Sequence, residues 1–270
     1  MSLRRSSGIL LHPTSLPGSP GIGTLGIQAR SFIDWLESAG QTLWQILPLG
    51  PTGYGDSPYA SFSTFAGNPL LIDLDLLAKD AILTQDDIVP PDYIKSSGPI
   101  DFGAVVWWKL PLLRKAAKNF LLAGNNSEYQ EFLISNKAWL DDYALFMDIK
   151  NSFDQKARVE GLYGRLWNNY WPRDLATRDR KALESWSAAH AESISEEKVI
   201  QFFFFRQWKA LRAYAHTKGV SIIGDIPIFV AADSADVWSN QRFFQLNKDG
   251  TPKFVAGVPP DYFSETGQLW

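Results

Sequence analysis

The chain has 270 residues, of which 45% are apolar and 20% are charged, and its formal net charge is −3. This composition excludes a disordered chain and is typical of a globular protein with one large α/β domain or two smaller ones. The acidic balance argues against nucleic acid as a partner, and the absence of cysteine excludes a disulfide framework.

The remaining bulk features exclude a metal site and a membrane anchor. The three histidines are scattered along the sequence and show no metal-ligand spacing. Residues 1–15 contain two arginines but only a short apolar run, which is too short for a signal peptide. No apolar run approaches the roughly 20 residues that a membrane span needs. The sequence therefore predicts a soluble, cytoplasmic protein without a membrane partner.

The first part of the chain predicts a strand, a helix and a second strand. Gly8–His12 is a short apolar run, and Ile27–Gly40 has apolar residues at helical spacing and ends on a glycine. A second apolar run, Thr42–Gly50, contains Pro48 near its end. Strand, helix and strand over about 40 residues form a βαβ unit, whose two strands are parallel.

The middle of the chain has a different pattern. Tyr129–Phe153 carries aromatic and aliphatic residues at helical spacing, and Ala104–Leu122 predicts another helix with a kink at Pro111. No strand pattern is found between residues 80 and 195. We therefore predict a mainly helical insertion subdomain over residues 81–195.

The last part resumes the βα pattern. Ser193 and Glu196 have the spacing of a capping box, and the helix they open ends at Gly219. Val220–Phe229 follows as a third apolar strand. We thus expect the first barrel strands and a substrate loop in residues 1–80, and a third strand unit with a covering loop in residues 196–270.

Three strands of this type are too few to close a (β/α)₈ TIM barrel, which has eight. The helical insertion uses over a hundred residues, so the remaining strands have no place in the printed sequence. The fold class that we predict is α/β, with a (β/α)₈ barrel of which this chain holds about three strands.

Gly21–Gly26 matches the spacing G-x-G-x-x-G of dinucleotide-binding loops. That fingerprint needs its first glycine directly after a strand and an acid at the end of the next strand. Here eight residues separate the strand from Gly21, and the second strand ends without an acid. A turn-rich loop is the better interpretation.

The loop Gly50–Pro69 is the first candidate site. Asp56 is the only charged residue in it, and Tyr54, Ser57 and Tyr59 lie close by in the sequence. Carboxylates and hydroxyls suit sugar hydroxyl groups, and aromatic faces cover the apolar C–H patches of a sugar ring. The alternative is an Asp-Ser-Pro turn with packed tyrosines.

Two further loops carry acids. Asp225 ends the third apolar strand, where an acid indicates an active site more often than a structural cap. Asp233, Ser234 and Asp236 have the pattern of a helix start. The last loop is aromatic and acidic, and the alternative for it is an ordered surface loop; its candidate residues are Asp261, Tyr262, Ser264 and Trp270.

Four motifs in these loops resemble the amylomaltase or disproportionating-enzyme family, the 4-α-glucanotransferases. They are GILLHPTSLPG, QILPLGPTGYGDSPYASFSTFAGNPLLIDL, GDIPIFVAADSADVW and VAGVPPDYFSETGQLW. They occur in the order of the family and cover both ends of the chain, while the helical middle adds little.

The resemblance implies an α-amylase-like barrel with helical subdomains inserted between its strands. It implies an enzyme that passes a segment of α-1,4-glucan to the 4-hydroxyl of glucose or another maltooligosaccharide, through a retaining covalent mechanism and without a cofactor. Its partners would be α-1,4-glucans and maltooligosaccharides. Retention requires two close carboxyl groups.

The resemblance also implies roles for individual residues. Asp56, Ser57 and Tyr59 resemble donor-subsite residues, Tyr54 an outer glucan position, and Asp225 a group that positions the sugar at the cleavage point. Asp261, Tyr262, Ser264 and Trp270 resemble a loop that covers the donor glucan; such a cover would keep water from the covalent intermediate.

The family's catalytic residues are not identified in this chain. The nucleophilic aspartate of the family stands in an Arg-x-Asp-His context, which the sequence does not contain. We expect this aspartate and the glutamate acid/base beyond Trp270, so that the printed chain alone would be inactive. The alternatives are a glucan hydrolase of the α-amylase type and an inactive glucan-binding fragment.

Overall fold

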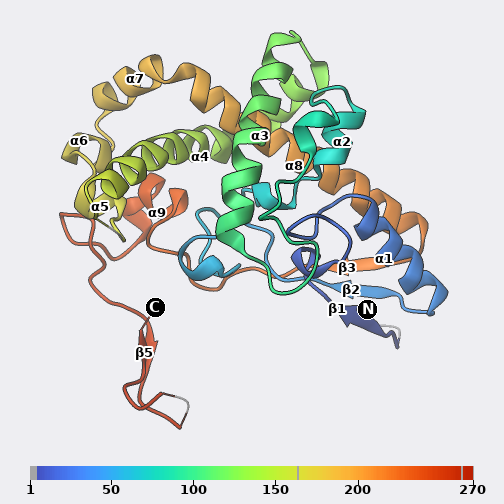
Figure 1. Cartoon of the computed structure of the whole chain (residues 1–270). Helices are drawn as coiled ribbons and strands as arrows, with labels where there is room; N and C mark the ends of the chain where they lie inside the picture. The colour runs from blue at the N-terminus through green and yellow to red at the C-terminus, as the bar shows by residue number, and fades with distance from the viewer. Residues whose placement is uncertain (1–4, 163, 263, 270) are drawn as a thin grey trace.

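The computed structural model describes residues 5–162, 164–262 and 264–269, and it describes only the backbone of Tyr54 and Leu269 (Figure 1). The helices are α1 (Ile27–Ser38), α2 (Leu74–Lys79), α3 (Phe102–Leu122), α4 (Ser127–Val159), α5 (Trp167–Tyr170), α6 (Arg173–Ala176), α7 (Arg180–Ala189), α8 (Ala191–Thr217) and α9 (Ala235–Ser239). The strands are β1 (Gly8–Leu10), β2 (Leu43–Gln45), β3 (Ser221–Ile223), β4 (Gly257–Val258) and β5 (Gln268–Leu269).

Strands β1, β2 and β3 form a parallel sheet with β2 in the centre. Ile9, Trp44 and Ile222 lie beside one another across the three strands. The predicted βαβ unit is confirmed, since α1 connects β1 to the parallel strand β2. Each strand is shorter than its apolar run, because prolines follow β2 and β3 closely and cannot donate a hydrogen bond to the sheet.

The two faces of the sheet differ in burial. Trp44 is completely buried, and Ile9 and Ile222 pack against the same core. On the opposite face, Leu10 is 57% exposed and Ile223 is 42% exposed. The prediction that Val220–Phe229 forms one strand is therefore wrong beyond Ile223, because the following residues, with Pro227 among them, leave the sheet as an exposed loop.

Helix α8 is the centre of the main core. Its consecutive residues Phe202, Phe203 and Phe204 are 2%, 0% and 2% exposed. Rings from two other helices contact them, Phe120 of α3 and Phe132 of α4. Three consecutive side chains point to different sides of a helix, so α8 is buried all round at this point.

Between β2 and β3 the described residues form helices and turns but no strand, as the sequence predicts. Helix α3 continues through Pro111 as one element. Helices α4, α5, α6 and α9 share a second core, in which Phe146, Trp171 and Trp238 contact one another. The division into three domains stays a prediction.

The predicted capping box at Ser193 and Glu196 is wrong. Helix α8 begins two residues earlier, at Ala191, and Ser193 lies inside it. The Ser193 hydroxyl donates to Asp148 of α4 at 2.5 Å, and Glu196 pairs with Arg114 of α3 at 3.3 Å. Both side chains therefore connect α8 to its neighbouring helices and do not cap it.

Candidate carbohydrate site

The loops that follow β2 and β3 meet at the carboxyl end of the sheet. The two strands are parallel neighbours, so their following loops leave the same edge. There the Tyr59 hydroxyl donates a hydrogen bond to Asp225 Oδ2 at 2.8 Å. Two candidates that are 166 positions apart in the sequence are thus brought together.

This pair lies open to solvent. Tyr59 is 47% exposed, and Asp225 is also exposed. The hydrogen bond to the Asp225 carboxylate, together with partial burial and the negative charge, raises the pKa of Tyr59 above its ordinary value of 10.0. The other oxygen, Asp225 Oδ1, accepts the backbone N–H of Ile226 at 2.8 Å. The carboxylate is held from both sides, yet it can still accept from hydroxyl groups of a ligand.

Asp56 and Ser57 form the turn that leads to Tyr59. Gly55 and Asp56 both have left-handed backbones, with φ of 69° and 54°. Aspartate tolerates this conformation better than most residues because its short side chain bonds locally. The Ser57 hydroxyl accepts the backbone N–H of Tyr59 at 3.3 Å. The Asp56 side chain is exposed, and in the sequence it lies close to Tyr59. The side chain of Tyr54 lies outside the described residues.

The predicted covering loop lies elsewhere. Asp261 Oδ1 accepts the backbone N–H of Ser264 at 2.9 Å, and the Ser264 hydroxyl donates to the carbonyl of Gly267 at 2.7 Å. These residues form the turn of the β4–β5 hairpin, which stands off the rest of the chain in Figure 1. Tyr262 is 90% exposed at its tip. The structure does not bring these candidates to Tyr59 and Asp225, and Trp270 lies outside the described residues.

A buried side chain on α8 that no sequence motif indicated holds the Gly50–Pro69 loop. Gln201 of α8, completely buried, accepts from Gly67 N–H at 2.8 Å and donates to Gly67 C=O at 3.0 Å. Its apolar neighbours in sequence gave no sign of this contact.

The predicted helix start at Asp233–Asp236 is confirmed, because Ser234 caps α9 by accepting the Val237 N–H. The Asp236 carboxylate, however, reaches across to Thr64.

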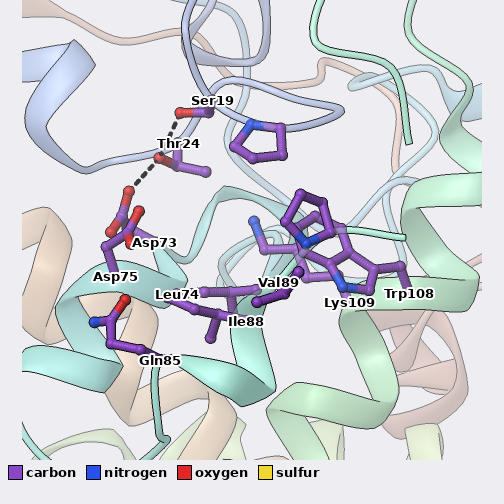
Figure 2. Close-up of a pocket in the computed structure, with 12 residues that line it drawn as sticks. Ser19, Thr24, Asp73, Leu74, Asp75, Gln85, Ile88, Val89, Trp108 and Lys109 are labelled. Carbon is purple, nitrogen blue, oxygen red and sulfur yellow. Dashed lines mark hydrogen bonds between the residues drawn. The ribbon is translucent and has the colours of Figure 1, made fainter. Parts of the chain in front are cut away.

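A separate pocket of about 270 Å³ lies between the loop at residues 19–24, α2 and α3 (Figure 2). Three of its polar side chains, Thr24, Asp73 and Lys109, are hydrogen-bonded within the protein. Thr24 donates to Asp73 Oδ2 at 2.6 Å, and Asp73 caps α2. Lys109 donates to the carbonyl of Leu70 at 2.6 Å, and burial lowers the pKa of Lys109 to about 7. None of the candidate residues lines this pocket.

Gly26 explains why the G-x-G-x-x-G spacing occurs next to this pocket. A side-chain Cβ at Gly26 would lie 1.9 Å from Asp73 Oδ2, so only glycine fits beside the carboxylate. Gly21 has a φ of 75°. These glycines serve a packed turn, in agreement with the interpretation of the segment as a turn-rich loop.

The described part of the chain offers no candidate metal centre and no candidate membrane span. No group of three or more histidine, aspartate or glutamate side chains there is placed to hold a metal ion. None of the helices described has the length and apolar character needed to cross a membrane.

The family model described as 4-alpha-glucanotransferase matches residues 11–270. A 4-alpha-glucanotransferase of Thermus thermophilus is 48% identical over 273 residues, which cover 100% of this chain and 52% of that protein. A chloroplastic/amyloplastic 4-alpha-glucanotransferase of Arabidopsis thaliana is 44% identical, with 99% and 45% covered. The chain spans about half the length of the curated relatives it matches.

Solved structures of two amylomaltases are also similar. The amylomaltase from Streptococcus agalactiae in complex with acarbose has a TM-score of 0.87 at 40% identity, over 99% of this chain and 52% of that one. The amylomaltase from Corynebacterium glutamicum has a TM-score of 0.61 at 20% identity, over 98% and 35%, which is a similarity of fold alone.

Proposed function

Because the chain belongs to the 4-alpha-glucanotransferase family, we propose that its protein transfers segments of α-1,4-glucan to the 4-hydroxyl of glucose or another maltooligosaccharide. The observation that carries the site assignment is the hydrogen bond of 2.8 Å between Tyr59 and Asp225. It joins two of the four motifs through which the sequence resembles this family.

The chemistry of these two residues suits a sugar. The Asp225 carboxylate accepts from sugar hydroxyl groups, and its negative charge strengthens those hydrogen bonds. The half-exposed ring of Tyr59 offers an apolar face to the C–H groups of a glucose unit. Asp56 and Ser57 extend this surface along the same turn, with Tyr54 as an outer position. We propose that maltooligosaccharides and acarbose bind here.

Asp225 serves binding and orientation in this proposal. A retaining mechanism needs a nucleophilic carboxylate and an acid/base carboxyl group about 5–5.5 Å apart. Tyr59 is the partner of Asp225, and a tyrosine hydroxyl that donates to a carboxylate is not the second carboxyl group. The nucleophilic aspartate and the acid/base glutamate therefore stay a prediction for positions beyond Trp270, within a complete (β/α)₈ barrel.

The Asp261–Ser264 turn and Trp270 would act as a cover in this proposal. In the present arrangement the turn stands off the site, so covering a glucan requires the β4–β5 hairpin to move as a unit. Strands β4 and β5 pair with each other, so the hairpin would keep its own backbone pairing in such a movement. A cytoplasmic location also stays a prediction, since the relatives include a chloroplastic/amyloplastic protein.

The test is product analysis after incubation of maltotriose with the complete protein, including the part expected beyond Trp270. Transfer produces glucose together with oligosaccharides longer than maltotriose, whereas hydrolysis produces only shorter sugars. The second pattern would replace the proposal by the hydrolase alternative. Binding of maltotriose by folded protein without any product would favour the glucan-binding alternative.

The Tyr59→Phe variant tests the site itself. It keeps the ring but removes the hydrogen bond to Asp225, and we expect the dissociation constant for maltotriose to rise by about tenfold. An unchanged dissociation constant would remove this pair from the proposed glucan surface.

A further inference from the structure

The two loops that form the proposed glucan surface are also joined away from that surface. Asp236 Oδ2 accepts the backbone N–H of Thr64 at 2.8 Å, and Asp236 Oδ1 accepts the Thr64 hydroxyl at 3.3 Å. Next to this contact, the N–H of Ala235 donates to the carbonyl of Phe62 at 2.8 Å. Asp236 therefore holds the same loop that carries Tyr59.

The contact at Asp236 is of a strong kind. Its acceptor is a carboxylate, and hydrogen bonds to charged acceptors are roughly twice as strong as neutral ones. Burial raises the pKa of Asp236, and the two bonds from Thr64 act in the opposite direction by favouring the charged form. Loss of this carboxylate would leave the Thr64 N–H without the acceptor that fixes it.

A helix outside the two loops supports the same contact. Lys150 of α4 donates to Asp233 Oδ2 at 2.7 Å, just before α9 begins. The Lys150 amine also lies 5.0 Å from the centre of the Phe62 ring. The Lys150 side chain is only 8% exposed, so this ion pair is protected from solvent. The start of α9 and the Phe62–Thr64 segment are thus both fixed to the helical layer.

The segment between Thr64 and Tyr59 is itself held by hydrogen bonds. Ser61 is 5% exposed, and its hydroxyl contacts the carbonyls of Pro51 at 3.0 Å and Ser63 at 2.7 Å. Thr52 and Ser61 also pair as an isolated β-bridge. The chain between Thr64 and Tyr59 therefore runs through hydrogen-bonded residues and not through a loose loop.

We propose that Asp236 is a positioning residue, which holds Thr64 so that Tyr59 stays within hydrogen-bond distance of Asp225. The proposal rests on the proposed function in one respect, namely that the surface at Tyr59 and Asp225 binds glucan. Asp236 does not touch the sugar in it. Its role is to set the distance between the two loops that do.

The variants that test the proposal are Asp236→Ala and Asp236→Asn. The alanine removes both acceptors, whereas the asparagine keeps one oxygen for the Thr64 N–H and should restore the loop. Asp174→Ala is the matched control, because Asp174 also lies in the first turn of a short helix and bonds to the N–H of the adjacent Leu175. This control shows how much of any effect comes only from losing an acidic residue in the first turn of a helix.

The first measurement is amide hydrogen exchange, which does not depend on any sugar. We expect Asp236→Ala to speed exchange in residues 57–66, with Asp236→Asn and Asp174→Ala close to the unmodified protein. Unchanged exchange in residues 57–66 would overturn the proposal. If Asp236→Ala does not fold, Asp236→Ser takes its place, since that side chain is shorter than aspartate and retains a hydroxyl for the first turn of α9.

The second measurement is the dissociation constant for maltotriose. We expect an increase of about tenfold in Asp236→Ala, because a displaced contact group loses its hydrogen bonds. In a Tyr59→Phe background the same substitution should add little, since both changes act on one contact. Full additivity would overturn the proposal. If the unmodified protein binds no maltotriose, the proposed function fails, while hydrogen exchange still decides the role of Asp236 in the loop.

Discussion

The helical core and the loops at the carboxyl end of the sheet use the same kinds of residue in opposite ways. In the core, Phe203 is completely buried and its neighbours on α8 are nearly so. In the loops, Tyr59 and Phe65 are 47% and 59% exposed. An aromatic residue therefore says little about function until its exposure is known, and the many aromatics of this chain divide between the two uses.

Polar groups show the same contrast. Gln201 and Gln207 of α8 are 0% and 5% exposed. Gln201 makes two hydrogen bonds to the backbone of Gly67, and Gln207 makes two to the backbone of Asp73. The exposed Asp225 carboxylate accepts from the Tyr59 hydroxyl and from the Ile226 N–H, and it can accept more hydrogen bonds. Saturated polar groups stabilise the fold, and unsaturated exposed ones are available to a ligand.

The substitution with the largest expected effect on stability is Phe203→Ala, in the helical core. Removing a fully buried ring leaves a cavity between α8 and α3, so the free energy of unfolding should fall by about 3–5 kcal/mol. Urea denaturation of the two proteins measures it. The control is Phe243→Ala, because Phe243 is 70% exposed, and its effect should stay within about 0.5 kcal/mol. Equal effects at both positions would break the comparison.

A smaller effect is expected from Gln201→Ala. The substitution leaves the N–H and the carbonyl of Gly67 buried without their partners, which should cost about 1–3 kcal/mol of stability. Gln28→Ala is the control, since Gln28 makes a single exposed bond of 3.4 Å to Gly18. Denaturation curves compare the two, and a similar loss in both would show that the buried contact to Gly67 is not special.

Lys109 should make the stability of the core depend on pH. Burial lowers its pKa to about 7 in the folded protein, from the ordinary value of 10.5. Between these two values the unfolded chain binds more protons than the folded one, so stability rises as the pH rises from about 7 to about 10.5. Below pH 7 the cost of charging the buried amine is fully present.

The Lys109→Met variant tests this dependence. It removes the titrating group, so the melting temperature should rise less between pH 7 and pH 10 than in the unmodified protein. Lys181→Met, at an exposed position, is the control. The same rise in Lys109→Met and in the unmodified protein would show that another group is responsible.

The smallest effect on stability is expected from Asp56→Asn. Asparagine tolerates the left-handed backbone at this position, and the side chain is exposed, so the free energy of unfolding should change by less than about 0.5 kcal/mol. The loss of the negative charge should nevertheless weaken maltotriose binding. Calorimetry measures both quantities. A large loss of stability would place Asp56 with the structural residues.

Local pattern in the sequence was sufficient for several of the elements. Apolar spacing predicted the βαβ unit, the strand-free middle region and a helix at Ile27–Gly40, which the structure shows as Ile27–Ser38. These features depend on residues that are neighbours in the chain, so their periodicity appears directly in the sequence. The motifs were also sufficient for the family, which the comparisons confirm.

Only the tertiary structure decided which of these residues meet. The strand predicted over Val220–Phe229 is wrong beyond Ile223, since an apolar run does not show whether another layer covers it; Ile226 and Ile228 are 77% and 91% exposed. The capping box failed because Ser193 finds a partner on another helix, Asp148. The contacts of Tyr59 with Asp225 and of Thr64 with Asp236 span 166 and 172 positions. Such contacts follow from how strands and helices pack, a property of the whole fold that no local pattern contains.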